Sequence, residues 1–362
     1  MPSQSRGFKI AAAALGCLLA VGSAEVVLRV FFGMSEDLGH AFRAFDPLGV
    51  EIEPHGEGGY RPRPGAIFEY RNGTRSTIHE HGYRGSGPSS PATPDTRRIV
   101  LVGGSTAHGW GVNDDGAIDA HLVRALANRG IRAEVYNLAF DGYDSWQCLQ
   151  RLRSDAAKLD PHAVVLHTGI NDVRNAKIEG LEAGDRRSIL WATVLDRLKA
   201  DRERGGPSLW TRLKHRSYLA RFPGFLRHLR RLRPTEGATD GIPVFDDAER
   251  VFLENLGSMP EAVTSRPWWL GSTPPSRLAL DAGEPPQGVS YWLNDARETE
   301  AYRRRLARSL RGWTDSLPSG GYVAARVDFD DFLDDCHLTV EGNRKVAEAM
   351  ANWLVPRLAE ED

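Results

Sequence analysis

The middle of the chain alternates between short runs of apolar residues and amphipathic stretches of ten to fifteen residues. Three short segments rich in apolar residues, at 98–102, 133–136 and 163–167, have the length of β-strands, and the third is continuously apolar. The stretches at 119–129 and 144–159 have helical spacing of their apolar positions. Apolar strands separated by helices are typical of a parallel sheet with helices on both faces. The pattern therefore predicts an α/β fold.

Farther along the chain the signals are less regular. An amphipathic segment at 340–358 predicts a closing helix. Residues 259–298 are rich in proline and tryptophan and predict a loop. Two interpretations of its tryptophans are open. One is that the loop lines or covers a site, and the other is that the tryptophans pack on the surface of the protein.

The N-terminus has the pattern of an export signal or a membrane anchor. Arg6 and Lys9 precede an uninterrupted run of apolar and small residues at 10–24. Apolar character resumes at 26–32. A continuous helix would therefore reach the ~20 residues that a membrane span requires.

Three processing states agree with this segment. Residues 22–24 (Gly-Ser-Ala) form an acceptable cleavage site, which would give a soluble exported protein. An uncleaved helix would be a single-pass anchor with its positive end in the cytoplasm. Glu25 and Arg29, four residues apart, would then pair at its outer end. A lipidated Cys17 is the third alternative. In every case we expect the body of the chain outside the cytoplasm, at the cell membrane or in the periplasm.

We predict three parts along the chain. Residues 1–33 form the signal or anchor, and residues 34–97, rich in glycine, proline and polar residues, form a stalk that ends in a small β extension. Within this extension, β-like pieces at 67–70 and 77–79 flank an Asn-Gly turn. Residues 98–362 form the main domain.

A basic helical insertion is expected within the main domain, at about 186–298. Its first part, 186–233, has 14 Arg or Lys against three acids, a local charge of +11. One interpretation is a solvated helical surface. The other is an amphipathic surface that lies against anionic lipid headgroups. The apolar side of that surface would be Trp191, Leu195, Leu198, Trp210, Leu213, Tyr218, Phe222, Phe225 and Leu229.

Charge and cysteine content argue against several classes of function. The chain has 46 Lys plus Arg and 48 Asp plus Glu, a net charge of −2, so it lacks a global field that holds a polyanion, and we expect no nucleic-acid partner. Its three cysteines lack the CxxC spacing of structural zinc sites, and we predict no metal and no cofactor. Cys148 and Cys336 either pair, as an oxidising exterior permits, or remain free thiols.

Glycine and polar residues follow the predicted strands, where an open α/β sheet binds its ligands. A Gly-Gly-Ser-Thr turn with Ser105 follows the first strand, and Asn-Leu-Ala-Phe-Asp-Gly, ending at Gly142, follows the second. Gly-Ile-Asn-Asp, with Asn171, follows the third, and residues 334–337 (Asp-Asp-Cys-His) lie near the C-terminus. Each piece alone is common in proteins. Their joint order at strand ends indicates one site.

This set of motifs resembles the SGNH (GDSL-type) hydrolase family, whose four blocks are a Gly-Asp-Ser turn, a glycine after the second strand, a Gly-x-Asn-Asp turn and a late Asp-x-x-His. The match covers roughly 98–175 and 328–355, and Ile-His-Glu-His-Gly-Tyr-Arg-Gly at 78–85 resembles the lead-in of membrane-anchored bacterial members. The resemblance implies a three-layer α/β/α fold of the SGNH or flavodoxin-like type. One departure is Gly104, where the family has an aspartate before the serine.

The resemblance implies a role for each matched residue. Ser105 is the expected nucleophile, His337 its base and Asp334 the acid that orients the histidine. The backbone N–H groups of Ser105 and Gly142 and the side-chain amide of Asn171 are the expected oxyanion-hole donors. Elementary chemistry supports these roles, because a serine hydroxyl needs a base to take its proton and a tetrahedral oxyanion needs donors.

Two other readings of these residues are open. Asp335, two residues before His337, is a rival orienting acid. Gly103-x-Ser105-x-Ala107 is close to the nucleophile elbow of α/β-hydrolases, in which Ser, Asp and His follow in the same order.

We therefore expect an exported, membrane-anchored serine esterase that acts on an acyl ester, such as an acetyl ester, of a glycan or lipid through an acyl-serine intermediate. One alternative is an O-acyltransferase that modifies an envelope glycan, since a sugar hydroxyl can replace water as the acceptor. Another is a non-catalytic module of the same fold that binds a glycan or lipid. The expected partners are the acyl-ester substrate and, through the N-terminal helix, the membrane.

Overall fold

The computed structural model describes residues 3–34, 52–57, 59–70, 72–85, 95–189, 192–205, 209, 217–232, 245–280 and 296–359. They belong to two compact units, one made of Met1–Val50 with Asp196–Ala238 and the other of Glu51–Leu195 with Thr239–Asp362.

The larger unit contains a sheet of five strands in the order β6-β5-β7-β8-β9, with every neighbouring pair parallel. The first strand along the chain thus lies between the second and the third, as in flavodoxin-like doubly wound folds. The α/β fold with a parallel sheet, predicted from the apolar runs, is confirmed. The strands are β5 (Arg97–Gly103), β6 (Ala133–Asn137), β7 (Ala163–His167), β8 (Trp268–Ser272) and β9 (Gly320–Val323).

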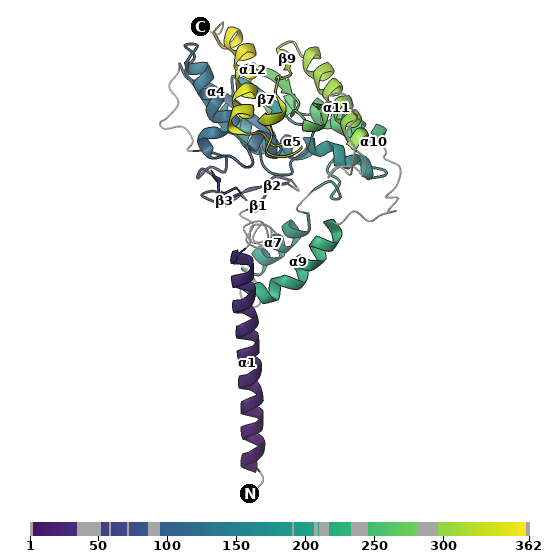
Figure 1. Cartoon of the computed structure of the whole chain (residues 1–362). Coiled ribbons are helices and arrows are strands. Elements are labelled where there is room, and N and C mark those ends of the chain that lie inside the picture. The colour runs from purple at the N-terminus through teal and green to yellow at the C-terminus, as the bar shows by residue number, and fades with distance from the viewer. Residues whose placement is uncertain are drawn as a thin grey trace. The chain divides into compact units, whose positions relative to one another are not determined.

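Helices cover both faces of this sheet (Figure 1). α4 (Ile118–Ala127) and α12 (Val340–Ala359) lie side by side on one face. α5 (Ser145–Arg151), α10 (Phe245–Gly257) and α11 (Ala296–Ser316) cover the other. The expected three layers are therefore present.

Alternate residues of β5 serve the two helical layers. Leu101 belongs to a buried cluster with Leu122 of α4 and Leu354 of α12. Val100 and Val102 point to the opposite face, because successive side chains of a strand alternate, and both are fully buried. Since burying each such side chain stabilises the fold by about 1.5–3 kcal/mol, a strand that is apolar throughout is explained by helices on both sides.

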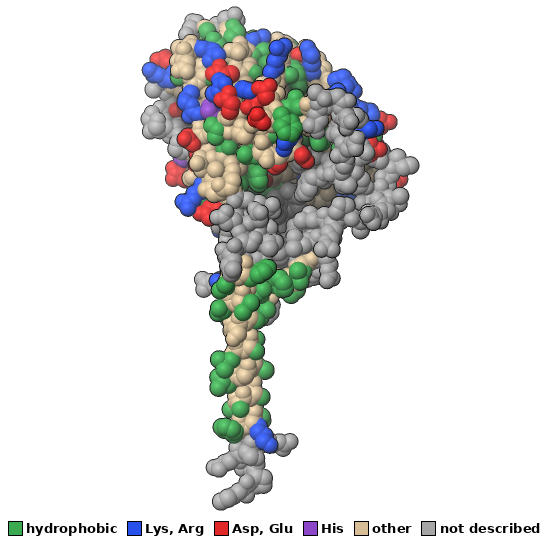
Figure 2. Space-filling view, in the orientation of Figure 1, with side chains coloured by type: hydrophobic (Ala, Val, Ile, Leu, Met, Phe, Trp, Pro, Cys, Tyr) green, Lys and Arg blue, Asp and Glu red, His purple; other side chains and the backbone are tan. Residues whose placement is uncertain are grey.

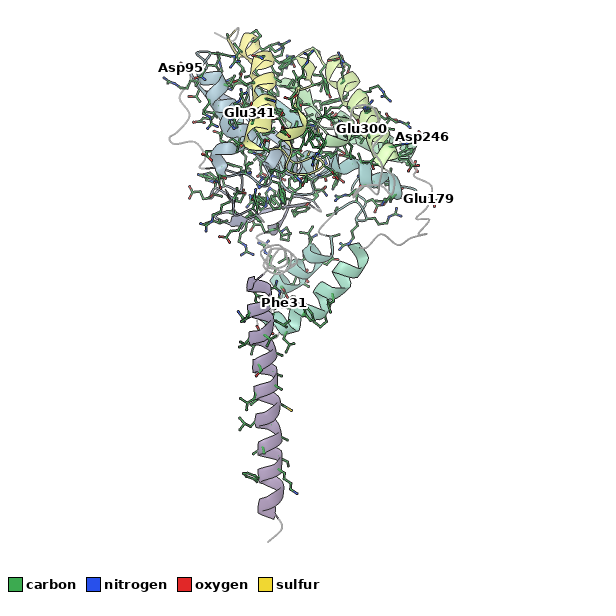
Figure 3. The ribbon with its side chains drawn as sticks, viewed as in Figure 1. Phe31, Asp95, Glu179, Asp246, Glu300 and Glu341 are labelled. Atoms are coloured by element: carbon green, nitrogen blue, oxygen red, sulfur yellow. The ribbon has the colours of Figure 1, made fainter. Side chains whose placement is uncertain are left out.

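Ion pairs fasten α10 to α11. Arg305 of α11 reaches Asp246 at 2.6 Å and Glu249 at 2.5 Å, both on α10. Glu300, one turn earlier on α11, is nearly buried and holds Arg303 at 2.7 Å and Arg304 at 2.6 Å. Figure 3 shows Asp246 and Glu300 on these two neighbouring helices.

Three helices predicted from spacing are present with shifted ends. The segment 119–129 is α4, and 340–358 is α12. The segment 144–159 begins as α5, continues as a π-helical turn at Leu152–Ala156 and ends as α6 (Ala157–Leu159). A capping box starts α5, because the Asp144 side chain accepts the Gln147 N–H while the Gln147 side chain accepts the Asp144 N–H.

One expectation is wrong within the segment 259–298. Trp268–Ser272, inside this predicted loop, forms β8, an interior strand of the sheet that pairs with β7 and β9. Trp269 is buried there, so it is a core residue. Residues 281–295 of the same segment lie outside the described residues.

The segment before the sheet forms two small antiparallel hairpins, and both belong to the larger unit. β1 (Ile52–His55) pairs with β2 (Gly59–Pro62), and β3 (Ile67–Glu69) pairs with β4 (Arg75–Thr77). The second hairpin is the one predicted around the Asn-Gly turn, with its return strand two residues earlier than expected. Residues 35–51 and 86–94 of the predicted segment 34–97 lie outside the described residues.

The smaller unit contains α1 (Ser3–Met34), most of α7 (Ala192–Glu203) and α9 (Tyr218–Leu232). Within α1, Phe8–Phe31 is long and apolar enough to cross a membrane, and a signal sequence passes the same test. Apolar side chains are distributed along the visible surface of α1, between tan backbone and other atoms (Figure 2).

The predicted contact between Glu25 and Arg29 is present at 2.8 Å. Of the apolar side proposed for the basic segment, Trp191, Trp210 and Leu213 lie outside the described residues.

Candidate active site

The strand order places a topological switch point at the carboxyl end of the sheet, between β5 and β7. The chain leaves β5 toward β6 on one side and returns to β7 on the other, and such a reversal is where open α/β sheets bind ligands. Ser105 follows β5 directly and Asn171 follows β7. Topology therefore brings together two predicted site residues that are far apart in the sequence.

Ser105 is the first residue of the short helix α3 (Ser105–His108), and 8% of its surface is exposed. The turn that delivers it must pass close to β7, since a Cβ on Gly103 would lie 2.1 Å from the His167 carbonyl oxygen. Glycine at position 103 thus follows from packing.

The imidazole of His337 links Ser105 to Asp334. Its Nε2 lies 2.8 Å from Oγ of Ser105, and its Nδ1 lies 2.7 Å from Oδ2 of Asp334. A carboxylate only accepts, so Nδ1 carries the hydrogen and donates it. In the neutral ring Nε2 then has a free lone pair that accepts the Ser105 hydroxyl hydrogen.

The loop around Asp334 explains the three-residue spacing between acid and histidine. Oδ1 of Asp334 accepts the backbone N–H groups of Cys336 at 3.0 Å and His337 at 2.8 Å, while Oδ2 binds the imidazole. One carboxylate therefore shapes the turn and orients the ring. Asp335, the rival acid, is exposed, and its carbonyl accepts the Arg277 N–H at 2.9 Å.

The indole of Trp110 packs on one face of the His337 imidazole. The rings of Trp110 and His337 lie with centroids 4.5 Å apart, tilted by 34°. Trp110 also contacts Tyr70, from the segment after β3, with centroids 5.5 Å apart. The imidazole is thus fixed by a carboxylate at one edge and by an indole on one face.

The surroundings of His337 change its acidity and that of Asp334. Burial lowers the pKa of His337, but neighbouring Cys336 and the Asp334 carboxylate more than compensate, so its pKa lies well above the usual 6.5. Burial raises the pKa of Asp334, but the hydrogen bond from His337 leads a set of interactions that lower it overall. The acid is therefore ionised at neutral pH.

The two other predicted oxyanion donors lie on loops at the same end of the sheet. Gly142 has φ of 78°, a conformation that glycine adopts without strain, and its carbonyl accepts from Arg174 at 3.0 Å. The Asn171 amide nitrogen donates one hydrogen to the Tyr143 carbonyl at 2.8 Å. An amide nitrogen carries two hydrogens, so one remains for another acceptor.

Gly104, where the resembled family has aspartate, lies against Asn171. A Cβ at position 104 would lie 2.3 Å from Nδ2 of Asn171 and 3.2 Å from the Tyr143 carbonyl oxygen. Because Gly104 has no side chain, the Asn171 amide can lie this close to the backbone at position 104.

Asp172, next to Asn171, is engaged in the loop. It accepts the backbone N–H of Ser145 at 3.0 Å and its hydroxyl at 2.6 Å. Burial, together with nearby Asp144, raises the pKa of Asp172 to about 7. Through these two hydrogen bonds, Asp172 ties its own loop to the start of α5.

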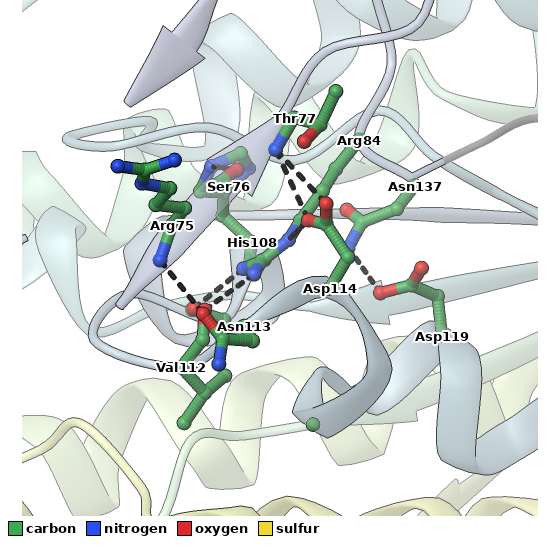
Figure 4. A network of polar contacts seen from close by, with 12 residues as sticks. Arg75, Ser76, Thr77, Arg84, His108, Val112, Asn113, Asp114, Asp119 and Asn137 are labelled. Atoms are coloured by element: carbon green, nitrogen blue, oxygen red, sulfur yellow. Dashed lines mark hydrogen bonds and ion pairs between the residues drawn. The ribbon is translucent and has the colours of Figure 1, made fainter. Parts of the chain in front are cut away.

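A buried arginine in the 78–85 lead-in, Arg84, holds the segment after the serine. Arg84 donates from Nη1 to the carbonyls of His108 and Gly109, both at 2.5 Å, and from Nη2 to that of Val112 at 2.6 Å (Figure 4). Its Nε contacts Asp114 at 3.0 Å. Sequence reasoning missed this function, although the 78–85 lead-in contains the residue.

His108, three residues after Ser105, is occupied on both ring nitrogens. Nδ1 lies 3.0 Å from the Ala139 carbonyl, which only accepts, so Nδ1 donates and Nε2 accepts the Ser76 hydroxyl at 3.1 Å. Burial, with Arg84 nearby, lowers its pKa well below 6.5. The ring is therefore neutral and part of the packing.

Two buried cysteines and one group of possible metal ligands are present among the described residues. Cys148 and Cys336 are free and buried. Among the described residues, Asp334, Cys336 and His337 have ligand atoms within 4.8 Å of one another. A cation bound there would compete with the hydrogen bond between Asp334 and His337. The absence of a metal or cofactor remains a prediction.

Comparison with known proteins gives one family and several similar structures. Residues 101–345 match the family model for the GDSL-like lipase/acylhydrolase family. A solved acetyl xylan esterase, AlAXEase, is 14% identical, with 71% of this chain and 99% of that chain covered and a TM-score of 0.41. A lipase/acylhydrolase from Enterococcus faecalis is 14% identical, with 72% and 96% covered and a TM-score of 0.39. No relative among curated proteins matches the chain.

Proposed function

The chain belongs to the GDSL-like lipase/acylhydrolase family and is an ester-bond hydrolase, and on this premise we propose that it cleaves acyl esters through a covalent acyl-Ser105 intermediate. The observation that carries the proposal is the continuous hydrogen-bonded line from Ser105 through His337 to Asp334, with links of 2.8 and 2.7 Å. These are the groups and the order that an activated serine requires.

In the first step Ser105 attacks the ester carbonyl. The Oγ–carbon bond forms as the hydroxyl proton moves to Nε2 of His337, and the carbonyl π electrons move to its oxygen. Asp334 stabilises the imidazolium and holds its orientation. The resulting oxyanion is bound by the backbone N–H groups of Ser105 and Gly142 and by the Asn171 amide.

The second step releases the alcohol. The oxyanion reforms its carbonyl, the carbon–oxygen bond to the alcohol breaks, and His337 gives its proton to the leaving oxygen. Water then attacks the acyl-serine with His337 as base. His337 takes a proton from this water as the new carbon–oxygen bond forms. When the intermediate collapses, the bond between the acyl carbon and Oγ breaks and His337 returns the proton to Ser105, which frees the carboxylic acid.

We further propose that α1 is retained as a single-pass anchor, so that the hydrolase works at the outer side of the membrane on an acyl ester of a glycan or lipid. Two features support this. Phe8–Phe31 has the length and apolar character of a span, and Arg6 just before it and Lys9 at its start favour a cytoplasmic N-terminus.

Labelling with a fluorophosphonate tests the nucleophile. The full chain in detergent should gain the mass of one adduct, and Ser105→Ala and His337→Ala should each abolish it along with p-nitrophenyl acetate hydrolysis. Ser258→Ala, after the end of α10, is the matched control and should label like the wild type. A folded wild type without an adduct, or an adduct that persists in Ser105→Ala, would overturn the proposal.

A further inference from the structure

Glu25 is an acidic residue near the end of the apolar helix α1, and the first turn of α9 binds its carboxylate. The backbone N–H groups of Tyr218 and Leu219 donate to its two oxygens at 2.9 and 2.8 Å. The Ser217 hydroxyl donates at 2.9 Å, and Arg29 completes the set at 2.8 Å. The N–H groups of a first helical turn have no partner within their own helix. Glu25 accepts those of Tyr218 and Leu219, and the Ser217 hydroxyl accepts that of Ala220 at 3.1 Å, so the two side chains together cap α9.

This contact has a physical reason to persist beside a membrane. A carboxylate at the edge of an apolar span is costly unless it is paired, and the N-terminus of a helix is the favourable end for a negative charge. The Arg29 guanidinium lies 4.8 Å from the centre of the Tyr218 ring, which adds a second link between the two helices. α9 is therefore fastened to α1 where the span ends, near Phe31 (Figure 3).

The sequence of α9 is amphipathic and free of acidic residues. Apolar residues at 218, 222, 225, 229 and 232 have the spacing of one helix face. Leu226 is 39% exposed, so apolar surface of α9 is left open within the described structure. The cationic residues of the helix are Arg221, Arg227, Arg230 and Arg231.

We propose that α9 lies in the plane of the membrane surface, with its apolar side at the boundary of headgroups and acyl chains and its arginines on anionic phospholipid headgroups, and that Glu25 is the latch that holds it beside α1. Charge complementarity selects this partner, because a helix with four arginines and no acid is attracted to anionic lipid. The proposal rests on retention of α1 as an anchor. It does not depend on the chemistry at Ser105.

The test measures the depth of α9 in a bilayer. The full chain carrying Cys17→Ala is placed in nanodiscs of phosphatidylcholine, with or without phosphatidylglycerol, and a nitroxide is attached at Leu226→Cys. In anionic discs the label should favour contact with oxygen over a water-soluble nickel chelate, at the depth of about 5–10 Å typical of interfacial helices. Without phosphatidylglycerol, or in high salt, it should become accessible to nickel. Leu253→Cys on α10, equally exposed at 39%, is the matched label and should stay in water throughout.

Two sets of variants separate the arginines from the latch. Replacing Arg227, Arg230 and Arg231 by Gln should remove the dependence on phosphatidylglycerol, whereas Gln at the exposed Arg304, Arg311 and Arg344 should leave it intact. Glu25→Ala should speed amide hydrogen exchange at Tyr218 and Leu219 by about tenfold, the equivalent of one lost hydrogen bond.

The failures are distinguishable. A chain recovered from membranes without residues 1–24 overturns both the anchor and the surface helix. A full chain whose label at position 226 stays in water in every disc, or responds equally to neutral and anionic lipid, overturns the surface helix alone. Neither result touches the fluorophosphonate experiment.

Discussion

The sulfur of Cys336 lies 3.8 Å from Nδ1 of His337, the same nitrogen that donates to Asp334. The thiol is buried, so it belongs to the immediate surroundings of the proposed base. Against the effect of burial, Cys336 and Asp334 together raise the pKa of His337 above 6.5.

The raised pKa predicts the pH dependence of the reaction. Only the neutral imidazole can take the Ser105 proton, so kcat/KM should rise with pH through a pKa above 6.5 and be lost as the pH falls below it. Cys336→Ala should move this rising limb to lower pH, and Cys148→Ala, which removes another buried thiol, should not. The profile of p-nitrophenyl acetate hydrolysis measures both. An unmoved limb in Cys336→Ala would contradict the assignment.

The orienting acid can be identified by paired substitutions. Asp334→Asn should lower kcat by roughly 10³- to 10⁴-fold, because an amide no longer fixes the catalytic tautomer. Asp335→Asn changes an exposed neighbour and should stay within a few-fold of the wild type. Steady-state kinetics of both variants decide between the two acids, and the reverse ranking would assign the role to Asp335.

Asn171→Ala tests the side-chain oxyanion donor. Loss of one such donor typically lowers kcat by about 10²- to 10³-fold, and KM should change little if the interaction strengthens only in the transition state. Asn175→Ala, on the same 3-10 turn (Asn171–Lys177), is the control for general disturbance of the loop. Equal losses in kcat and in substrate affinity would give Asn171 a binding role instead.

Gly104→Asp restores the residue that the resembled family has before its serine, and we expect it to impair this enzyme. A Cβ at position 104 would lie 2.3 Å from the Asn171 amide nitrogen, so the amide must move. The loss in kcat should approach that of Asn171→Ala, about 10²-fold or more. Gly104→Ala should show the same effect with no added charge. Full activity in either variant would mean that the asparagine tolerates the shift.

Arg84→Gln should destabilise the larger unit and loosen the turn that carries Trp110. Three buried carbonyls lose their donor, at a cost of about 1 kcal/mol or more each, so the free energy of unfolding should fall by roughly 3 kcal/mol. Loss of the ion pair with Asp114, which is partly exposed, should add little to this decrease in the free energy of unfolding. Urea unfolding of the full chain in detergent measures this, and Arg84→Lys should recover part of the loss. A change under 1 kcal/mol would refute the role.

The strands that surround the reaction centre were predictable because each is short, apolar and followed by glycine or asparagine. β5, β6 and β7 match their predictions to within two residues at each end. β8 was missed because Trp-Trp-Leu-Gly-Ser lies among prolines and its glycine, Gly271, interrupts the signal of a continuous apolar run. That glycine is explained only by α11, since a Cβ on Gly271 would lie 2.7 Å from Thr314.

The site residues that follow a strand or belong to a short motif could be predicted from the sequence. Those that act through contacts between loops could not. Ser105, Asn171 and the Asp334–His337 pair each lie within a recognisable spacing. Arg84 and Trp110 have no such spacing. Arg84 binds carbonyls that lie 24 to 28 positions farther along the chain. Trp110 packs on the ring of His337, on a loop that is distant in the sequence. Their roles depend on tertiary packing and became visible only in three dimensions.

The distance of 232 positions between Ser105 and His337 also fixes an order of events during synthesis. A nascent chain acquires Ser105, Gly142 and Asn171 well before Asp334 and His337, which follow more than 150 positions after Asn171. Until the 334–337 loop is made and folded, the Ser105 hydroxyl has no imidazole beside it. On the proposed mechanism, the emerging polypeptide therefore has no activated serine until this late segment is in place.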